Sequence, residues 1–95
     1  MEKKYHLRLY LAGVAPDNQA SILSLKTELT RVLGNDYSLE IIDVLERPQL
    51  AEEERILATP TAVRMLPNPI KKVIVNFSDH TNTLIGLDLI EKDNL

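Results

Sequence analysis

The first regular feature of the chain is an alternation of apolar and polar residues from Tyr5 to Leu11. A period of two residues is typical of a strand, and here it predicts one buried face and one polar face that carries Arg8 and Tyr10. Gly13 and Pro16 interrupt the alternation, so we expect the strand to end before them.

A helical pattern follows at residues 17–34. Apolar residues recur there at spacings of three and four, at Ile22, Leu25, Leu29, Val32 and Leu33. Asp17 suits the N-cap of such a helix, and Gly34 with Asn35 supplies a left-handed stop. The pattern therefore predicts an amphipathic helix between these two signals.

The segment after this helix is predicted to be a second strand. Residues 39–45 are almost continuously apolar, which is typical of an interior strand covered on both faces. A strand, a helix and a strand in this order form a βαβ unit, whose crossover is normally right-handed.

A second helix is expected from Pro48. The glutamates at 52–54 would lie near the positive end of its dipole, and three apolar side chains would face the core: Leu50, Ile56 and Leu57. The Thr-Pro-Thr sequence at 59–61 would then end the helix.

Beyond Pro60 the local signals conflict. Residues 70–77 are good strand formers and follow a Pro-Asn-Pro turn at 67–69, yet their apolar positions also fall at helical spacing. Residues 84–91 fit a helix as well as a strand, and Gly86 costs a helix interior about 1 kcal/mol relative to Ala. From the residues alone we expect the α/β order βαβαββα, the layout of thioredoxin-like domains, in which a cis proline often opens the third strand.

Composition narrows the class of protein. A hydrophobic share of 44 % suits one compact domain, residues 1–95. The formal net charge is −3, so the chain lacks the basic surplus of a nucleic-acid binder. No segment suits a signal peptide or a membrane span, and the absence of cysteine excludes disulfides and thiol redox chemistry. We expect a soluble cytoplasmic domain.

Several motifs with fixed spacing cover nearly the whole chain. They are Leu-Arg-Leu-Tyr-Leu-Ala-Gly at 7–13, Ile-Asp-Val-Leu at 42–45, Pro-Gln-Leu-Ala-Glu-Glu at 48–53, Ile-Leu-Ala-Thr-Pro-Thr at 56–61, Leu-Pro-Asn-Pro-Ile-Lys-Lys at 66–72 and Leu-Ile-Gly-Leu-Asp-Leu at 84–89. Their joint pattern resembles the KaiB family of circadian clock proteins.

The resemblance implies a regulatory protein, not an enzyme, that has no cofactor and exists in two folds. One is a homo-oligomer, a tetramer or dimer, of order βαββααβ, and the other is a monomer of thioredoxin-like order. The monomer is implied to bind a KaiC-type ATPase, to capture a KaiA-like protein and to compete with the KaiB-like sensor domain of a histidine kinase. The conflicting patterns at 70–77 and 84–90 suit such a switch.

The candidates for partner binding are Arg8 and Tyr10 on the polar face of the first strand, together with polar residues around the start of the second helix: Glu46, Arg47, Gln49, Glu52 and Glu53. The alternative is a solvated helix face and, for Tyr10, an amphipathic side chain that covers a sheet edge. The candidates for the fold switch are Pro60, Pro67, Pro69, Gly86 and Asp88, although Pro67 and Pro69 also suit plain turns. Gly86→Ala with Asp88→Arg is predicted to favour the thioredoxin-like monomer by making the last segment a better helix.

The sequence departs from the family at Glu46 and Arg47, where a Lys-Asn pair is common, and at Asn68, which interrupts a proline run. One alternative is therefore a KaiB-like paralogue in stress or two-component signalling that does not bind KaiC, and another is a stand-alone kinase sensor domain. A third is a glutathione-transferase-like enzyme domain that uses Tyr10 or a serine, but it lacks a second domain to complete its pocket. His6 and His80 have no neighbours at ligand spacing, so we expect no metal site.

Overall fold

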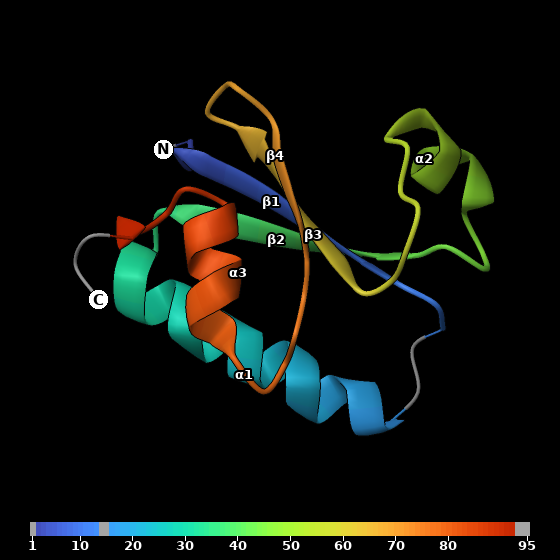
Figure 1. Cartoon of the computed structure of the whole chain (residues 1–95), viewed down its shortest axis with the longest axis horizontal. Helices are drawn as coiled ribbons and strands as arrows, with labels where there is room; N and C mark the ends of the chain where they lie inside the picture. Colours follow the sequence, from blue (N-terminus) through green and yellow to red (C-terminus); the bar gives the residue numbers. More distant parts are fainter. Residues whose placement is uncertain (1, 14–15, 93–95) are drawn as a thin grey trace.

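The computed structural model describes residues 2–13 and 16–92 (Figure 1). Its elements follow in the order β1 (Tyr5–Leu11), α1 (Pro16–Leu33), β2 (Tyr37–Asp43), α2 (Pro48–Glu53), β3 (Thr61–Leu66), β4 (Lys71–Ile74) and α3 (His80–Gly86). This order is βαβαββα, so the thioredoxin-like arrangement expected from the residues is confirmed. The conflicting C-terminal half forms a hairpin and a helix.

The four strands form one sheet in the order β2-β1-β3-β4. The β1–β2 pair is parallel, and the β1–β3 and β3–β4 pairs are antiparallel. The first strand is therefore central, whereas β2 lies at one edge and β4 at the other. The strand predicted at 39–45 exists as β2, but it lies at an edge of the sheet, so the predicted interior position is wrong.

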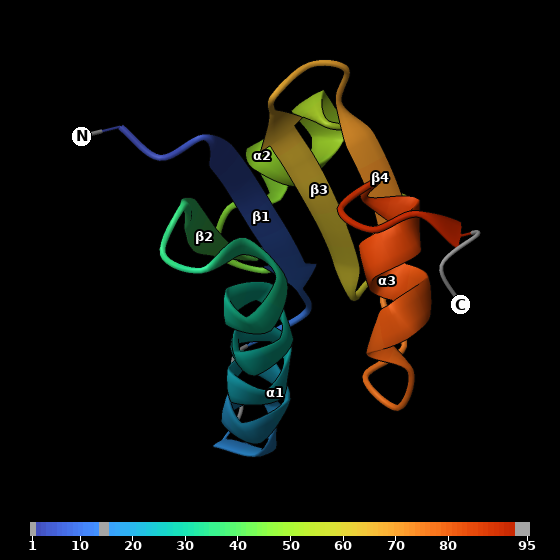
Figure 2. The same cartoon turned by 90° about the vertical axis from the view of Figure 1, so that its left-hand side faces the viewer.

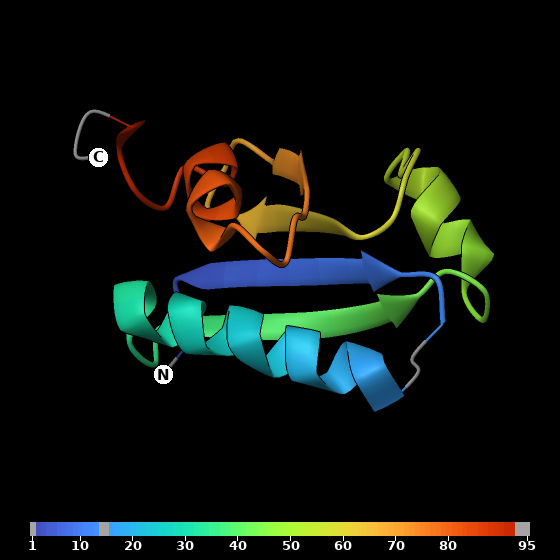
Figure 3. The same ribbon diagram turned by 60° about the horizontal axis from the view of Figure 1, so that its bottom comes forward.

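Two helices cover one face of the sheet and one short helix lies on the other. Figure 2 shows α1 and α3 on the near side of the strands and α2 on the far side. Figure 3 shows α2 beyond one end of the strands, away from both other helices. We call the side that carries α2 the α2 face.

The larger core lies between the sheet and the pair α1 and α3. It joins Leu7, Leu9 and Leu11 of β1 to buried residues of the helices, of β3 and of the C-cap after α3: Leu25, Leu29, Ala62, Leu84 and Leu87. The alternation in β1 and the helical spacing in α1 put their leucines on these facing surfaces. The amphipathic helix predicted at 17–34 is thus confirmed.

The smaller core lies on the α2 face and consists of Tyr10, Ile42 and Val63. Leu50 and Ile56 pack against it but are only partly buried, and α2 has no fully buried residue. The polar face predicted for β1 is therefore covered at Tyr10, because α2 lies over that end of the strand.

Two expectations for the second helix are wrong. Leu57 is 97 % exposed instead of facing the core, because α2 ends at Glu53 and the chain turns away. The early end also leaves the glutamates at 52–54 at the C-terminal end of the helix, where the dipole is unfavourable to negative charge. The predicted N-terminal dipole interaction is absent.

The helix ends follow one recurring pattern, in which a residue of positive φ comes one position after the C-cap. At the end of α2, Ile56 N donates to Ala51 O at 2.8 Å and Arg55 has φ 55°. At the end of α3, Leu89 N donates to Leu84 O at 2.9 Å. Asp88, with φ 58°, takes the left-handed position there, so both ends are Schellman motifs without glycine.

Gly34, with φ 63°, confirms the predicted left-handed stop of α1. The helix begins at Pro16, one residue before the expected N-cap. The side chain of Asp17 lies outside the described part of the chain.

Arg55→Gly should raise the free energy of unfolding by about 0.5–1 kcal/mol, because the left-handed conformation costs a residue with a Cβ more than glycine loses in entropy. Asp88→Gly should gain less, since aspartate tolerates this conformation. Urea denaturation measures both. The matched control Glu53→Gly, at the last residue of α2, should lower the free energy by up to about 1 kcal/mol, and a loss at Arg55→Gly would contradict the assigned conformation.

Candidate functional site

Charged side chains of β1, β2 and the chain before α2 form a connected group on the α2 face. Arg8 Nη1 donates to Tyr10 Oη at 3.1 Å, and Arg8 Nε donates to Glu40 Oε1 at 3.1 Å. The second oxygen of Glu40 lies 3.7 Å from Arg47 Nη1. We call Arg8, Tyr10, Glu40 and Arg47 the polar network.

Strand pairing explains why these residues meet. Arg8 lies opposite Glu40 in the parallel β1–β2 register, and Tyr10 lies two residues further along the same face of β1. Hydrogen bonding to the Tyr10 hydroxyl raises the pKa of Arg8, with Glu40 adding to the effect and burial opposing it. Arg8 therefore remains charged at every physiological pH.

Tyr10 does not lie where the sequence predicted. Its exposed fraction is 0 %, so it neither covers a sheet edge nor offers a surface to a partner in this fold. It instead fixes Arg8, whose side chain is 26 % exposed. Any contribution of Tyr10 to binding must pass through Arg8.

The other candidate residues lie on or just before α2, all of them exposed: Glu46, Arg47, Gln49, Glu52 and Glu53. Arg47 is the N-cap and makes no side-chain capping hydrogen bond, so its guanidinium is free to reach Glu40. Among the described residues, the other four side chains make no hydrogen bond or ion pair. Together with Glu40 they give this surface an excess of negative charge.

Sequence reasoning missed Glu40 and Asp43. Asp43 Oδ1 accepts hydrogen bonds from Gly13 N at 3.0 Å and Leu45 N at 2.9 Å, which ties the end of β1 to the start of the α2 connection. Both acidic residues interrupt the apolar run at 39–45. That interruption was the available signal, because an ionised side chain inside a buried strand needs a partner.

The three prolines proposed for the fold switch lie at the two ends of β3. The Thr59–Pro60, Leu66–Pro67 and Asn68–Pro69 peptide bonds are all cis. Pro60 precedes β3, and Pro67 and Pro69 form the turn to β4, where Pro69 O accepts a hydrogen bond from Arg64 Nη2 at 3.1 Å. Their role in a switch stays a prediction.

Gly86 has a packing role that the sequence did not reveal. A Cβ atom at this position would lie 2.7 Å from Val73 Cγ2 and 2.9 Å from Val73 Cβ, so glycine allows α3 to approach β4 closely. The argument that Gly86→Ala only improves the helix therefore omits a steric cost. Asp88 lies beyond α3, so Asp88→Arg acts on its left-handed cap and not on the helix interior.

The described residues offer little for catalysis. No group of three metal-ligating side chains occurs among them. Ser24 Oγ lies 2.8 Å from His80 Nε2, a pairing that sequence reasoning also missed. However, His80 Nδ1 is buried without a hydrogen-bond partner in the described part of the chain, so nothing orients the ring as in a catalytic triad. No described helix is long and apolar enough to span a membrane.

The chain is similar in sequence to known proteins of one family. The KaiB domain model matches residues 8–89. The circadian clock oscillator protein KaiB of Gloeothece citriformis is 49 % identical over 88 residues, covering 93 % of this chain and 83 % of that protein. KaiB1 of Synechocystis sp. is 47 % identical over 89 residues, covering 94 % and 85 %.

Solved structures agree on the fold. The N-terminal domain of SasA from Synechococcus elongatus superposes with a TM-score of 0.70 at 27 % identity, covering 88 % of this chain and 78 % of that one. Mitochondrial thioredoxin 3 of Saccharomyces cerevisiae gives a TM-score of 0.69 at 19 % identity, covering 93 % and 80 %, which shows the fold alone.

Tyr10→Phe should lower the free energy of unfolding by about 1 kcal/mol, because Arg8 loses a buried acceptor while the ring still fills its site. Tyr37→Phe is the matched control: its hydroxyl lies 2.8 Å from Thr30 Oγ1 and donates to Lys26 O at 3.1 Å, but water can replace these exposed partners, so the loss should be smaller. Urea denaturation compares the two variants. Equal losses would show that the buried hydroxyl does not hold Arg8.

Gly86→Ala and Val73→Ala should be coupled. The first change alone should destabilise this fold, because the new methyl group would lie within 3 Å of Val73 Cβ and Cγ2 and this clash outweighs the helix propensity gain of about 1 kcal/mol. A Val73→Ala background removes the contact with Cγ2 but keeps Cβ at 2.9 Å, so it should recover part of the loss and not all of it. A double-mutant cycle on unfolding free energies measures the coupling, and additive effects would contradict the close contact.

Proposed function

The chain belongs to the KaiB family, and from this premise we propose that it is a non-enzymatic regulator of a KaiB/KaiC-type clock or a related signalling system. It acts by binding a KaiC-type ATPase in the cytoplasm. The curated relatives are named as clock oscillator proteins, which supports a role in timing.

The observation that carries the proposal is the polar network. Arg8 and Glu40 lie opposite each other on the paired strands β1 and β2, and fully buried Tyr10 holds Arg8, so these two charges are fixed before a partner arrives. Fixed charges on an otherwise accessible surface give an interface its specificity and its rate of association. The surface formed by the network and by α2 is thus the proposed docking site.

The thioredoxin-like order described here is the proposed binding form, and a homo-oligomer of order βαββααβ is the proposed storage form. Two local features make the binding form costly: the left-handed residues Arg55 and Asp88, neither of which is glycine. Such costs support a low population of the binding form relative to the storage form. A partner needs only about 0.1–10 % of it to shift the equilibrium.

The similarity in fold to a kinase sensor domain supports a proposed competition for the ATPase. The likeness to the SasA N-terminal domain supports competition between this chain and the KaiB-like sensor domain of a histidine kinase for one site on the ATPase. Capture of a KaiA-like protein belongs to the same proposal, as a step after the ATPase is bound.

Glu53→Lys should weaken binding to a KaiC hexamer from the same organism at least about tenfold, because it reverses an exposed charge on the α2 part of the docking site. Sedimentation with ATP over several hours, followed by a titration, measures the loss. Glu91→Lys is the matched control, an exposed glutamate beyond α3, and should bind like the wild type.

Equal binding by both variants would contradict the proposed surface. Absence of wild-type binding in either nucleotide state would instead move the function to the alternative, a KaiB-like paralogue in stress or two-component signalling.

A further inference from the structure

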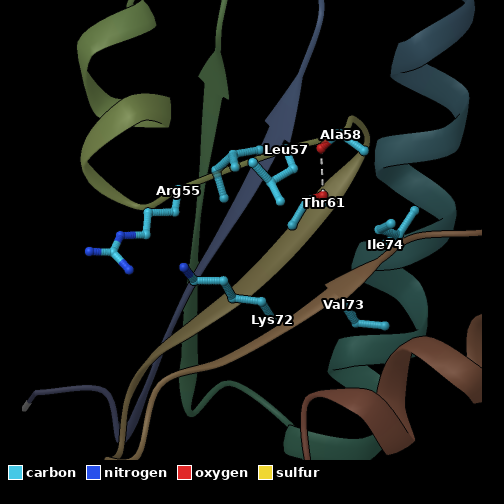
Figure 4. Close-up of a pocket in the computed structure, with 8 residues that line it drawn as sticks. Arg55, Leu57, Ala58, Thr61, Lys72, Val73 and Ile74 are labelled. Carbon is cyan, nitrogen blue, oxygen red and sulfur yellow. Dashed lines mark hydrogen bonds between the residues drawn. The ribbon is translucent and has the colours of Figure 1, made fainter.

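An apolar groove lies between β4 and the loop that follows α2 (Figure 4). Its volume is about 190 Å³, and its apolar lining comes from Ile56, Leu57, Ala58, Val73 and Ile74. Leu57 is 97 % exposed and Ile74 is 66 % exposed. Single exposed apolar residues are common, but two that line one groove mark a surface suited to a partner.

The groove lies along the free edge of the sheet. Within the described sheet, β4 pairs with β3 alone. Val75 N donates to Pro60 O at 2.9 Å, so its backbone points towards the β3 side. Backbone groups alternate in direction along a strand, which turns the N–H and C=O groups of Lys72 and Ile74 outwards. These groups are available to one more strand.

The side chains of the same two residues face the groove. Ile74 lies opposite Thr61 and Lys72 lies opposite Val63, a residue of the smaller core, so both belong to the α2 face. Thr61 Oγ1 donates to Ala58 O at 2.6 Å, which holds the loop beside the strand (Figure 4). Backbone edge and apolar groove therefore form one continuous surface.

Positive charge dominates this edge. Lys71 lies directly opposite Arg64 on β3, and among the described residues neither side chain pairs with a carboxylate. Arg64 is only 5 % exposed, and its Nε is buried without a hydrogen-bond partner. Like charges opposite each other across a strand pair are unfavourable. A carboxylate supplied from outside would relieve this.

On the α2 face, Lys72 is partly neutralised, because its Nζ lies 3.9 Å from Glu54 Oε2. Arg55 stands exposed at the rim of the groove, and Figure 4 shows its guanidinium directed away from the other lining residues. Edge strands often carry lysines that prevent pairing. Here the lysines occupy only the first half of β4, and the half that carries Ile74 is unprotected.

We propose that the edge of β4 binds an extended, acidic segment of a partner protein as a fifth strand. In the antiparallel sense, an apolar residue of the segment lies over Ile74 and Leu57, and acidic residues follow beside Lys72 and Lys71. This predicts an apolar residue at the first position of the segment and acidic residues at the third and fourth, as in Leu-Thr-Glu-Glu. The surface is separate from the polar network, so the proposal does not depend on binding of KaiC.

A second copy of this chain is a poor occupant. It would bring another edge with Lys71 and Lys72 against the first, and the two positive edges would repel each other. An acidic segment satisfies the backbone, the apolar groove and the charges together, as in other cases of strand addition.

The test is a titration of the full chain with a fluorescent peptide that contains Leu-Thr-Glu-Glu, followed by anisotropy. Wild-type protein should bind it, and the peptide Leu-Thr-Lys-Lys should bind at least about tenfold more weakly. Ile74→Lys should weaken binding of the acidic peptide by a similar factor. Leu23→Lys is the matched control, since Leu23 on α1 is 65 % exposed, and it should leave binding unchanged.

Amide hydrogen exchange distinguishes strand addition from apolar contact alone. The amides of Lys72 and Ile74 should gain protection with the acidic peptide, whereas Val73 and Val75 should not change. A peptide methylated at alternate backbone nitrogens should fail to bind, a readout that needs no protein variant.

Binding without protection of these amides, equal binding of both peptides, or no binding would overturn the proposal. Self-association of the wild type that Ile74→Lys abolishes would overturn it as well, in favour of a second copy.

Discussion

The structure depends on burying the central strand β1 on both of its faces. One face is covered by two helices and a core of leucines, with Leu9 fully buried among them. The other face has only the six-residue α2 and the small core around Tyr10. Coverage of the two faces is therefore unequal, and the surfaces left on the α2 face are the ones suited to partners.

This asymmetry shapes the chemistry of the α2 face. Where α2 covers the strand, Tyr10 is fully buried and its hydroxyl needs a partner, which Arg8 provides. Beyond the part of the strand that α2 covers, Arg8 pairs with Glu40 and is partly exposed to solvent. The network is therefore held by the buried Tyr10 and presents charged groups at the surface. On the far side of α2, Ile74 and Leu57 remain exposed for the same reason. A polar surface and an apolar groove thus flank one short helix.

The sequence predicted the features that depend on local pattern. The element order, the leucine face of α1 and the left-handed stop at Gly34 follow from periodicity and backbone preference. It did not predict that β2 is an edge strand. Apolar side chains show that the faces of a strand are covered, but they do not show whether a neighbouring strand pairs with each of its two edges. Leu39 and Ile41 pack on the larger core, and Ile42 belongs to the smaller one.

The remaining features of the fold and of the site depend on contacts between residues that are far apart in the sequence. The conflict at 70–77 is resolved by pairing of β4 with β3 and by burial of Val75 in the larger core, neither of which is visible in a local window. Glu40 joins Arg8 across 32 residues of chain, and Gly86 meets Val73 from a different element. Candidate residues chosen from neighbouring positions in the chain therefore included Arg47 and missed Glu40.

The most direct test of the proposed binding form is backbone NMR of the labelled chain bound to a KaiC-type ATPase. We expect strand shifts at Lys71–Ile74 and helix shifts at His80–Gly86 in the bound state, with the largest perturbations at Arg8, Glu40 and α2. A helix at 70–77 in the bound state, or perturbations centred on α1, would contradict it.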